Sequence, residues 1–442
     1  MPDLSVDFAG IKSPNPFWLA SAPPTNSGYQ VMKAFDAGWG GAVWKTLGIP
    51  IVNVSSRYGG INYKGRRLAG LNNIELITDR QLKDNLYDIE EVKKYFPDHP
   101  VIASLMVQSR EEWQQIVKDV ENAGADAVEL NFGCPHGMCE RGMGSAVGQE
   151  PKVLKTITSW VKETAAVPVI VKLTPNISDI REPARAASKG GSDAISLINT
   201  IQSLIGIDID NFVPYPVVDG MSTNGGYCGP AVKPIALNMV KECALDPGVG
   251  IPISGIGGIE NWRDAVEYIL VGASTVQVCT AVMHYGFGII REIVSGVEEY
   301  MISKGFNSID DFCGRALPNI KNWEQLNLNY QVKAQIDEDK CIGCQICYTA
   351  CEDGAHQAIS LDNPNGNRVP LIIEDNCVGC NLCSLVCPVE NCITMVRKDE
   401  EAEPVSWEQR TQKGDIPVTW NDKLAGGAGH YVPEPKTALD KK

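Results

Sequence analysis

The sequence predicts an α/β protein, in which a (β/α)8 barrel is followed by a small cysteine-rich domain. Two observations carry this prediction. Over residues 1–315, short apolar segments of strand length alternate with segments whose apolar residues recur at the helical period, which is the pattern of a parallel α/β fold. After the barrel, two copies of one closely spaced cysteine motif lie within residues 336–396. Their density predicts a domain organised around whatever the thiolates bind.

Eight candidate strands fit a closed TIM-type barrel better than an open sheet. They alternate with segments of helical periodicity, for example Arg110–Ala123, Pro151–Ala165 and Asn261–Leu270. The strands are predicted at Pro16–Ala20, Gly41–Thr46, Val101–Met106, Ala127–Asn131, Val169–Leu173, Ala194–Asn199, Pro252–Gly255 and Thr275–Cys279.

The cysteine-rich domain carries the iron–sulfur motif Cys-x2-Cys-x2-Cys-x3-Cys twice. In a two-cluster ferredoxin, the first three cysteines of each copy hold one [4Fe-4S] cluster and the fourth binds the other cluster. Zinc sites separate their cysteine pairs by longer stretches, and disulfide frameworks are typical of small secreted chains. The predicted ligand sets are Cys341, Cys344, Cys347 and Cys387 for one cluster, and Cys351, Cys377, Cys380 and Cys383 for the other.

Polar residues stand at the carboxyl ends of the predicted strands, where barrels of this type carry their chemistry. Each one alone could be a helix cap or a surface residue. A purely structural barrel, however, has no need for two lysines and two asparagines at that rim, so together they predict an active site. The rim residues are Ser21, Lys45, Thr46, Asn131, Lys172, Asn199, Thr200, Gly257, Gly258 and Thr280.

A glycine-rich loop with a cysteine follows the strand that ends at Asn131. Gly137, Gly142 and Gly144 allow sharp or mobile backbone, as a lid over a substrate requires. Cys134 could be a nucleophile, a metal ligand or a proton donor, because a thiol with a pKa near ~8.5 can deliver a proton near neutral pH. A buried structural cysteine is the alternative, which the position of Cys134 on a loop at a strand end disfavours.

The last two barrel strands end in residues that suit a phosphate. The first of them runs into Gly257-Gly258 and the second into Thr280, and backbone N–H groups at these two strand ends commonly bind phosphate in barrels. No Gly-x-Gly-x-x-Gly motif opens a strand–helix unit, so no dinucleotide site is predicted. FMN fits, because one-electron clusters need a flavin to meet a two-electron substrate.

Composition excludes several classes of function. The chain has 442 residues, of which 44% are hydrophobic and 21% charged, which is ordinary for a soluble globular protein. It shows no signal peptide and no apolar stretch long enough to span a membrane. We therefore expect a cytoplasmic protein, whose other cysteines stay reduced. The net charge of −15 argues against a nucleic-acid partner.

These elements divide the chain into four predicted parts. Residues 1–315 form the FMN-binding barrel, 316–335 a linker, and 336–396 the domain with two [4Fe-4S] clusters. Residues 397–442 form a tail whose second half is rich in glycine and proline. Because the tail has little to bury, we expect an irregular wrap or partial disorder.

With these motifs on the page, the barrel resembles the one shared by dihydroorotate dehydrogenases and dihydropyrimidine dehydrogenase. Residues 316–396 resemble the cluster domain that follows that barrel in dihydropyrimidine dehydrogenase, and the dihydroorotate enzymes lack such a domain in the same chain. The stretches closest to the pyrimidine enzyme are Asn73–Ile77, Cys134–Met138, Glu140–Gly144 and Lys172–Asn176.

The resemblance implies roles for individual residues. Cys134 matches the family's general acid. Gly133 stands where the family usually has serine, so the contact of that hydroxyl is lost and the fine substrate preference is open. Contacts to the pyrimidine are implied at Asn73, Asn131, Gly133, Asn199 and Thr200. Contacts to FMN are implied at Ser21, Lys45, Thr46, Asn131, Lys172, Gly229, Gly257, Gly258, Cys279 and Thr280.

The resemblance also implies an activity, namely reduction of the 5,6 double bond of uracil and thymine in pyrimidine catabolism. Electrons from NAD(P)H, with NAD favoured over NADP, are expected to enter through a separate FAD- and NAD(P)-binding flavoprotein subunit of a hetero-oligomer. They would pass through the two clusters to FMN, whose N5 gives hydride to C6 while Cys134 gives a proton to C5. A dihydroorotate dehydrogenase-type enzyme and an electron-transfer subunit without pyrimidine chemistry are the alternatives.

Overall fold

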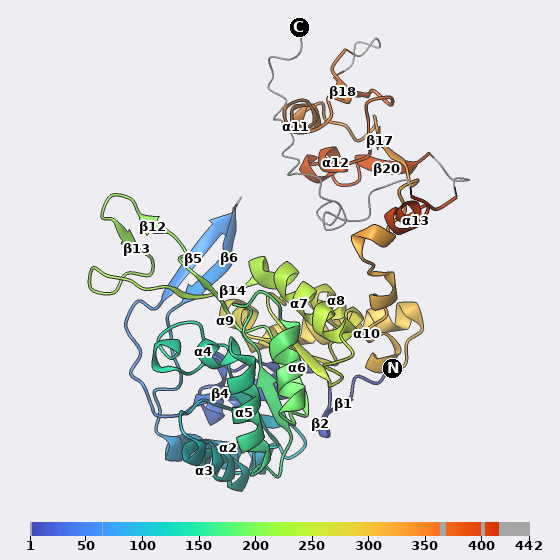
Figure 1. Cartoon of the computed structure of the whole chain (residues 1–442). Helices are drawn as coiled ribbons and strands as arrows, with labels where there is room; N and C mark the ends of the chain where they lie inside the picture. Colours follow the sequence, from blue (N-terminus) through green and yellow to red (C-terminus); the bar gives the residue numbers. More distant parts are fainter. Residues whose placement is uncertain (1, 64, 363–367, 399–402, 415–442) are drawn as a thin grey trace, which may run out of the picture. The chain divides into compact units, whose positions relative to one another are not determined.

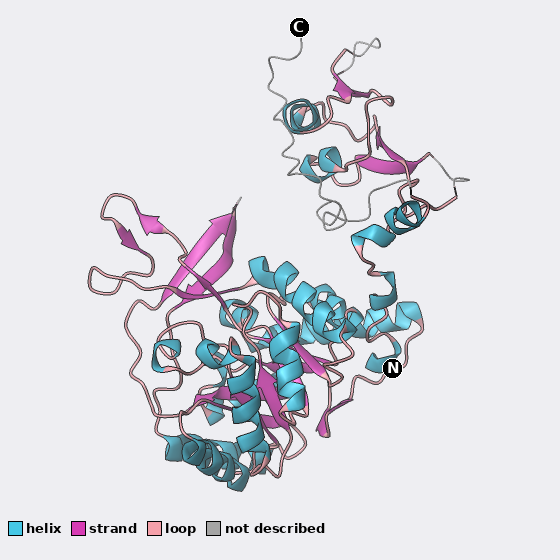
Figure 2. Cartoon of the chain, viewed as in Figure 1, coloured by secondary structure: helices cyan, strands magenta, loops and turns pink. Residues whose placement is uncertain are grey.

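The computed structural model describes residues 2–63, 65–362, 368–398 and 403–414. The chain divides into two compact units, Met1–Asn319 and Ile320–Lys442, so the division falls inside the predicted linker. The first unit contains the barrel and its helices, and the second contains short strands and helices (Figures 1 and 2). Among the described residues, no helix combines the length and the apolar character needed to cross a bilayer.

A closed barrel of eight strands forms the core of the first unit, as the sequence predicts. All eight pairings are parallel, and Val276 opposite Phe17 closes the ring between the last strand and the first. Each strand lies within two residues of its predicted ends. The strands are β3 (Phe17–Leu19), β4 (Gly41–Leu47), β7 (Val101–Leu105), β8 (Ala127–Asn131), β9 (Val169–Lys172), β10 (Ala194–Leu197), β15 (Ile253–Ile256) and β16 (Thr275–Val278).

Amphipathic helices cover the barrel, and α3 (Arg110–Asn122) shows why they form. Ser109 and Glu112 make a reciprocal capping box at its start, which satisfies backbone N–H groups that a helix leaves unpaired. Trp113, with Ile116, Val117 and Val120, is buried on one face. The other helices are α1 (Gly28–Ala37), α2 (Leu82–Tyr95), α4 (Ser145–Gly148), α5 (Pro151–Lys162), α6 (Arg181–Lys189), α7 (Lys233–Leu245), α8 (Trp262–Leu270), α9 (Thr280–Tyr285) and α10 (Ile290–Lys304).

A hairpin that the sequence analysis did not predict closes the amino-terminal end of the barrel. It consists of β1 (Val6–Phe8) and β2 (Ile11–Ser13). Phe8 and Ile11 pack with apolar side chains from the first half of several barrel strands, among them Trp18 and Ile170. Because this end is filled with apolar side chains, the cavity of the barrel opens at the carboxyl ends of the strands.

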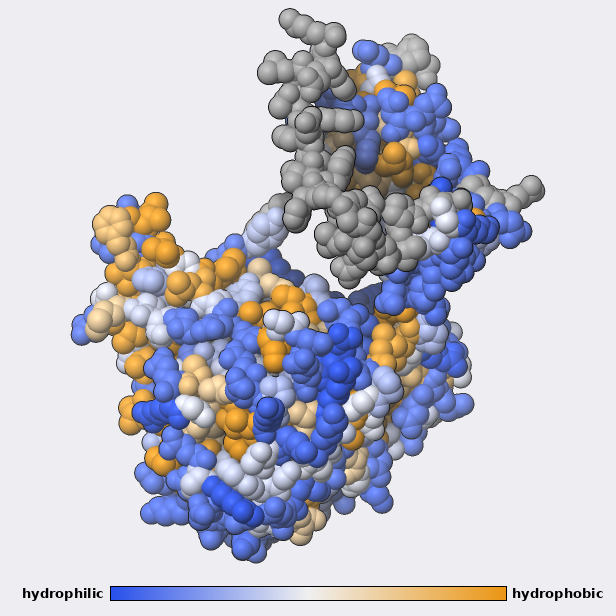
Figure 3. Space-filling model, viewed as in Figure 1, coloured by the Kyte–Doolittle hydropathy of each residue, from blue (hydrophilic) through white to orange (hydrophobic). Residues whose placement is uncertain are grey.

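An antiparallel arm, also missed by the sequence analysis, projects from the loops that follow β4 and β10. Its main sheet has the strand order β11-β14-β6-β5, and β12 pairs with β13. Figure 3 shows apolar side chains gathered on this arm, where Phe212 is 85% exposed. The strands are β5 (Tyr58–Tyr63), β6 (Arg66–Asn73), β11 (Ile201–Ser203), β12 (Ile207–Asp208), β13 (Val213–Pro214) and β14 (Gly225–Cys228).

The two cysteine motifs of the second unit are followed by similar secondary structure. Each motif runs into a helix, α11 (Ile346–Gly354) or α12 (Leu382–Val386). The helix α12 stops before Cys387 because Pro388 disfavours helical backbone at the preceding residue. In the first copy, Glu352 follows Cys351 and the helix continues through both. The strands are β17 (Val332–Ile336), which pairs with β20 (Ile393–Arg397), and β18 (Ile359–Ser360), which pairs with β19 (Leu371–Ile372).

Part of the predicted tail is regular structure, so the expectation of an irregular tail is wrong for that part. Helix α13 spans Trp407–Gln412, and the Trp407 ring lies 5.7 Å from that of Trp323. The Leu328 N–H donates to the Val405 carbonyl at 2.7 Å. Apolar rings and main-chain pairing thus hold this segment against the predicted linker. The remaining residues of the predicted tail, 399–402 and 415–442, lie outside the described residues.

Candidate active site and cluster sites

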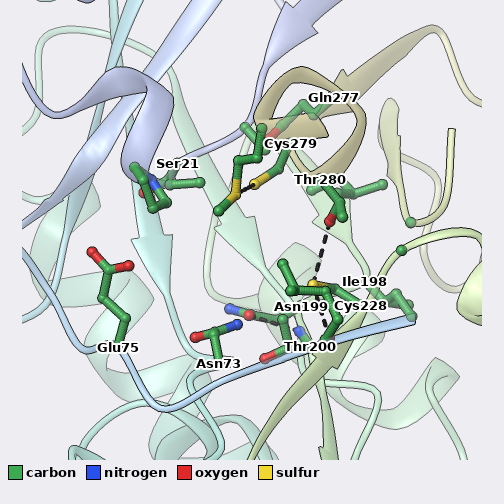
Figure 4. A pocket seen from close by; sticks show the side chains of 18 of the residues that line it. Ser21, Asn73, Glu75, Ile198, Asn199, Thr200, Cys228, Gln277, Cys279 and Thr280 are labelled. Atoms are coloured by element: carbon green, nitrogen blue, oxygen red, sulfur yellow. Dashed lines mark hydrogen bonds between the residues drawn. The ribbon is translucent and has the colours of Figure 1, made fainter. Parts of the chain in front are cut away.

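A cavity lies at the carboxyl ends of the barrel strands and is bordered by the arm. Figure 4 shows Asn73, Asn199 and Thr200 together on one side of it, with Glu75 nearby. Of the residues that the sequence analysis assigned to the barrel site, the cavity brings together Ser21, Lys45, Thr46, Asn73, Asn131, Cys134, Lys172, Asn199, Thr200, Gly229, Gly257, Gly258, Cys279 and Thr280.

Three asparagine amides in the cavity are held in fixed orientations. The Asn131 amide donates to Thr46 Oγ1 at 2.9 Å, and the Asn199 amide donates to Asn131 Oδ1 at 2.9 Å. The Asn73 amide donates to the Gly226 carbonyl at 3.2 Å, across the pairing of β6 with β14. An amide offers one acceptor and two donors in a plane, so three oriented amides can match the carbonyl and N–H groups on the edge of a flat heterocycle.

Gly133 is absent from the residues that line the cavity, because Asn199 packs against it. A Cβ built on Gly133 would lie 2.3 Å from Asn199 Cβ, far inside van der Waals contact. The Gly133 N–H also donates to Asn131 Oδ1 at 3.2 Å. The glycine therefore acts on the site by leaving room for Asn199. The direct substrate contact implied for position 133 is not supported by this geometry.

Cys134 lines the cavity with a half-buried side chain. Its thiol donates to the His136 carbonyl at 3.4 Å, and the His136 imidazole instead donates to the Glu75 carbonyl at 3.1 Å. The thiol and the imidazole are thus not arranged as a nucleophile and its base. Desolvation raises the pKa of the Cys134 thiol to about 11 and lowers the pKa of His136. The thiol keeps its proton at neutral pH, as a proton donor must.

The Cys134 loop is held by main-chain contacts. The Ser145 N–H donates to the Cys134 carbonyl at 3.0 Å. Gly144 has a φ of +57°, and a Cβ built there would lie 2.7 Å from the same carbonyl. A side chain at Gly144 would be strained in its backbone and would press on the loop. Cys139, the second thiol of the loop, donates to the Pro135 carbonyl at 3.3 Å and does not line the cavity.

Each of the two lysines in the cavity faces a carboxylate. Lys45 pairs with Glu75, which also accepts a hydrogen bond from the Tyr58 hydroxyl and lies 3.7 Å from Arg57 Nε. Burial and the Glu75 contact raise the pKa of Tyr58. The sequence analysis did not assign Glu75 to the site. Its place two residues after Asn73, in the same family-like stretch, was the signal available.

The second lysine, Lys172, lies 3.5 Å from Glu129, which is fully buried inside the barrel. The other oxygen of Glu129 accepts from Ser196 at 2.8 Å and from Gln277 at 3.3 Å. Glu129 Oε1, the oxygen that faces Lys172, has no hydrogen-bond partner among the described residues. Glu129 was also missed, although it shares a strand face with Asn131 two residues later.

Bare glycine backbone forms one edge of the cavity. Gly229, Gly257 and Gly258 have φ angles of +93°, +135° and +70°. A Cβ on Gly258 would lie 2.8 Å from the Gly229 carbonyl, and one on Gly257 would lie 2.9 Å from Ala236 Cβ. Such an edge lets a phosphate approach the main chain closely. With two buried lysines deeper in the cavity, these residues fit FMN.

Two smaller cavities in the second unit collect the eight cysteines of the repeated motif. One, of about 330 Å³, is lined by three cysteines of the first motif and the fourth of the second, and the other, of about 360 Å³, by the complementary four. Among the described residues, no three His, Cys, Asp or Glu side chains converge on a single-ion site. A cavity that gathers four motif cysteines matches the ligand number of a [4Fe-4S] cluster. The motif cysteines of the first cavity are Cys341, Cys344, Cys347 and Cys387, and those of the second are Cys351, Cys377, Cys380 and Cys383.

The backbone of each motif explains why three cysteines converge. Gly343 and Gly379 have φ angles of +65° and +69°, and Gln345 and Asn381 of +63° and +69°. These matched left-handed residues curl the two loops in the same way. Backbone N–H groups also reach the sulfurs, since Ala358 N–H donates to Cys351 Sγ at 3.3 Å. The fold of the loops therefore surrounds each cavity with sulfur.

Comparison with known proteins agrees with this geometry. A family model described as dihydroorotate dehydrogenase matches residues 3–301, and a model described as 4Fe-4S dicluster domain matches residues 334–395. The chain is 42% identical to the NAD-dependent dihydropyrimidine dehydrogenase subunit PreA of Escherichia coli, over 91% of this chain and 99% of that protein.

Two further relatives match about seven-tenths of the chain. The chain is 44% identical to the chloroplastic dihydropyrimidine dehydrogenase (NADP(+)) of Arabidopsis thaliana, over 72% of this chain and 77% of that protein. It is 38% identical to the catalytic subunit of dihydroorotate dehydrogenase B (NAD(+)) of Pyrococcus abyssi, over 71% and 99%. The match to the Escherichia coli subunit extends through the cluster domain as well. This chain belongs to the family of that dihydropyrimidine dehydrogenase subunit, with a barrel of the dihydroorotate dehydrogenase type and a 4Fe-4S dicluster domain.

Proposed function

We propose that the chain is the pyrimidine-reducing subunit of an NAD-dependent dihydropyrimidine dehydrogenase, which reduces the 5,6 double bond of uracil and thymine. The observation that carries the proposal is the group of oriented amides of Asn73, Asn131 and Asn199 in one cavity with the protonated thiol of Cys134. Amides suit the alternating carbonyl and N–H groups of a pyrimidine. The 42% identity to the Escherichia coli subunit, which extends over 99% of its length, supports the same conclusion.

Cys134 holds the proton that is delivered to a ring carbon. Burial raises its pKa to about 11, so the thiol stays protonated over the neutral range. The ammonium groups of Lys45 and Lys172 balance negative charge that develops beside them. FMN bound in this cavity would supply the hydride donor and would exchange single electrons with the clusters. Its phosphate is assigned to the glycine edge of the cavity.

The charges of the cavity favour uracil over orotate. Orotate is a uracil with an added carboxylate, which needs a cation. Both lysines that line the cavity already lie against carboxylates, Glu75 and Glu129. Glu75 itself lines the cavity beside the pyrimidine-binding amides, where it would repel a second carboxylate.

The eight cysteines of the second unit are proposed as ligands of two [4Fe-4S] clusters, with the fourth cysteine of each motif crossing to the other cluster. The two cavities support this assignment, because each gathers three cysteines of one motif and the fourth cysteine of the other. We assign the nicotinamide nucleotide to a partner, an FAD- and NAD-binding flavoprotein subunit in a hetero-oligomer. The cluster thiolates need a reducing compartment, which supports a cytoplasmic location.

The test compares two substrates under two electron sources. Anaerobic protein reduced with a viologen and dithionite is expected to convert uracil to dihydrouracil and to leave orotate unchanged. With NADH alone the same protein is expected to be inactive, and a co-expressed flavoprotein subunit is expected to restore NADH-dependent turnover. Preferential turnover of orotate would overturn the substrate assignment. Rapid NADH oxidation by the isolated chain would overturn the partner assignment.

A further inference from the structure

A fifth cysteine lines the cavity of the first cluster. Cys392 is 2% exposed and shares this cavity with the four proposed ligands. Its side chain lines the cavity together with those of Cys341 and Cys387, one ligand from each end of the proposed set. The repeated motif does not use Cys392, and the proposed electron path assigns it no role. A buried polar group next to two ligands of a redox centre calls for a physical explanation.

The second cavity has an alanine at the matching place. Cys392 comes directly before Ile393, the first residue of β20, and Ala358 comes directly before Ile359, the first residue of β18. Ala358 is also 2% exposed and lines the second cavity. Among the described residues that line this second cavity, the cysteines are the four proposed ligands alone. The two halves of the repeat therefore differ by one buried thiol.

A thiol at this place acts as a donor. An S–H group is a weak hydrogen-bond donor, and a ligand thiolate is a charged acceptor that strengthens such a bond. In the structure without a cluster, the Cys392 thiol donates to the Asp337 carbonyl, 3.7 Å from Cys392 Sγ. That carbonyl is neutral and already accepts the Cys341 N–H at 3.0 Å. The ligand sulfurs are thus the favoured acceptors of the Cys392 proton.

Hydrogen bonds to the sulfurs of an iron–sulfur site tune its potential, because they stabilise the more negative, reduced state. We propose that Cys392 is a positioning residue of the first cluster, which donates a hydrogen bond to the ligand thiolate of Cys341 or Cys387 and raises the reduction potential of that cluster. The reduction potential is raised relative to that of the same cluster in a protein with alanine at position 392. The inference rests on the proposed ligand sets, and it gives the two clusters different surroundings within one repeated fold.

The test measures potential in the intact holoprotein rather than turnover. Wild type, Cys392→Ala and Cys392→Ser are purified anaerobically, their iron is counted, and both clusters are titrated by EPR at controlled potentials. All three are expected to hold about eight irons. In Cys392→Ala, one cluster signal is expected to shift to lower potential. Its ratio of reduced to oxidised cluster at fixed potential should fall about fivefold, the scale of one hydrogen bond.

Cys392→Ser separates the hydrogen bond from packing, because it keeps a donor in a side chain of similar size. It is expected to retain most of the wild-type potential. The reciprocal variant Ala358→Cys, which adds a thiol at the second cavity, is expected to raise the potential of the other signal. Equal shifts in the serine and alanine variants, or no shift in either, would overturn the inference.

Iron content distinguishes the remaining outcomes. Loss of about half of the iron in Cys392→Ala would make Cys392 a ligand, which overturns its role as a donor. Zinc in place of iron in the wild type would instead defeat the proposed cluster assignment itself. The two failures are therefore told apart by metal analysis of two samples.

Discussion

Replacing Cys134 tests the proposed proton donor directly. Cys134→Ala removes the thiol and leaves the loop backbone in place, because the loop is held there by the hydrogen bond from the Ser145 N–H to the Cys134 carbonyl, 3.0 Å long. FMN, iron and uracil binding are expected to be retained. Turnover is expected to fall by ~10²–10⁴, the usual loss for a general acid. This equals about 2.7–5.4 kcal/mol of transition-state stabilisation.

The pH profile gives an independent measure of the same group. A proton donor is active below its pKa and loses activity as the pH rises through it. Because burial raises the pKa of Cys134 to about 11, wild-type turnover is expected to stay flat above neutral pH and to fall only near that value. An unperturbed thiol would lose its proton near ~8.5. Cys134→Ser is expected to be nearly as inactive as the alanine variant, since a hydroxyl is far less acidic than a thiol.

The assay follows dihydrouracil formation by chromatography, with viologen-reduced protein, so that electron delivery from a partner does not limit the rate. Cys139→Ala is the matched control, because its thiol lies on the same loop but does not line the cavity. Near-normal turnover is expected for this control. An inactive Cys139→Ala beside an active Cys134→Ala, or a wild-type rate that falls with a midpoint near ~8.5, refutes the reasoning.

Three further outcomes are expected. Gly133→Ala is expected to displace Asn199, at a cost of about 1–3 kcal/mol. The KM for uracil should therefore rise about tenfold, while the FMN content stays unchanged. An unchanged KM would show that Asn199 moves freely. Glu129→Gln leaves Lys172 buried without its carboxylate partner. The free energy of unfolding of the apoprotein should therefore fall by about 3 kcal/mol, measured by thermal unfolding. An unchanged Tm would contradict the proposed Lys172–Glu129 ion pair. Anaerobic removal of iron by a chelator should raise hydrogen exchange in residues 320–398, because cysteines make up much of the core of the second unit. Exchange in the barrel should not change. Protection retained in residues 320–398 would show that the second unit folds without its clusters.

The sequence by itself determined the barrel, the repeated cysteine motif and many of the residues that line the cavity. Eight parallel strands buried on both faces leave near-continuous apolar runs, so their ends were predicted within two residues. Polar residues at those ends had to meet, because the carboxyl ends of parallel strands share one edge. The cysteine spacing is strict because one cluster needs several sulfurs on a short loop. These features are local in the chain or follow from one known topology.

The tertiary structure alone decided which groups oppose one another. Glu75 and Glu129 were not assigned to the site from the sequence, because their ion pairs with Lys45 and Lys172 join side chains far apart in the chain. The arm was missed since its strands come from two separate loops and have no common sequence signal. The space that Gly133 leaves to Asn199 is likewise a contact between two strand ends. Such contacts are set by packing in three dimensions, which no local pattern of residues encodes.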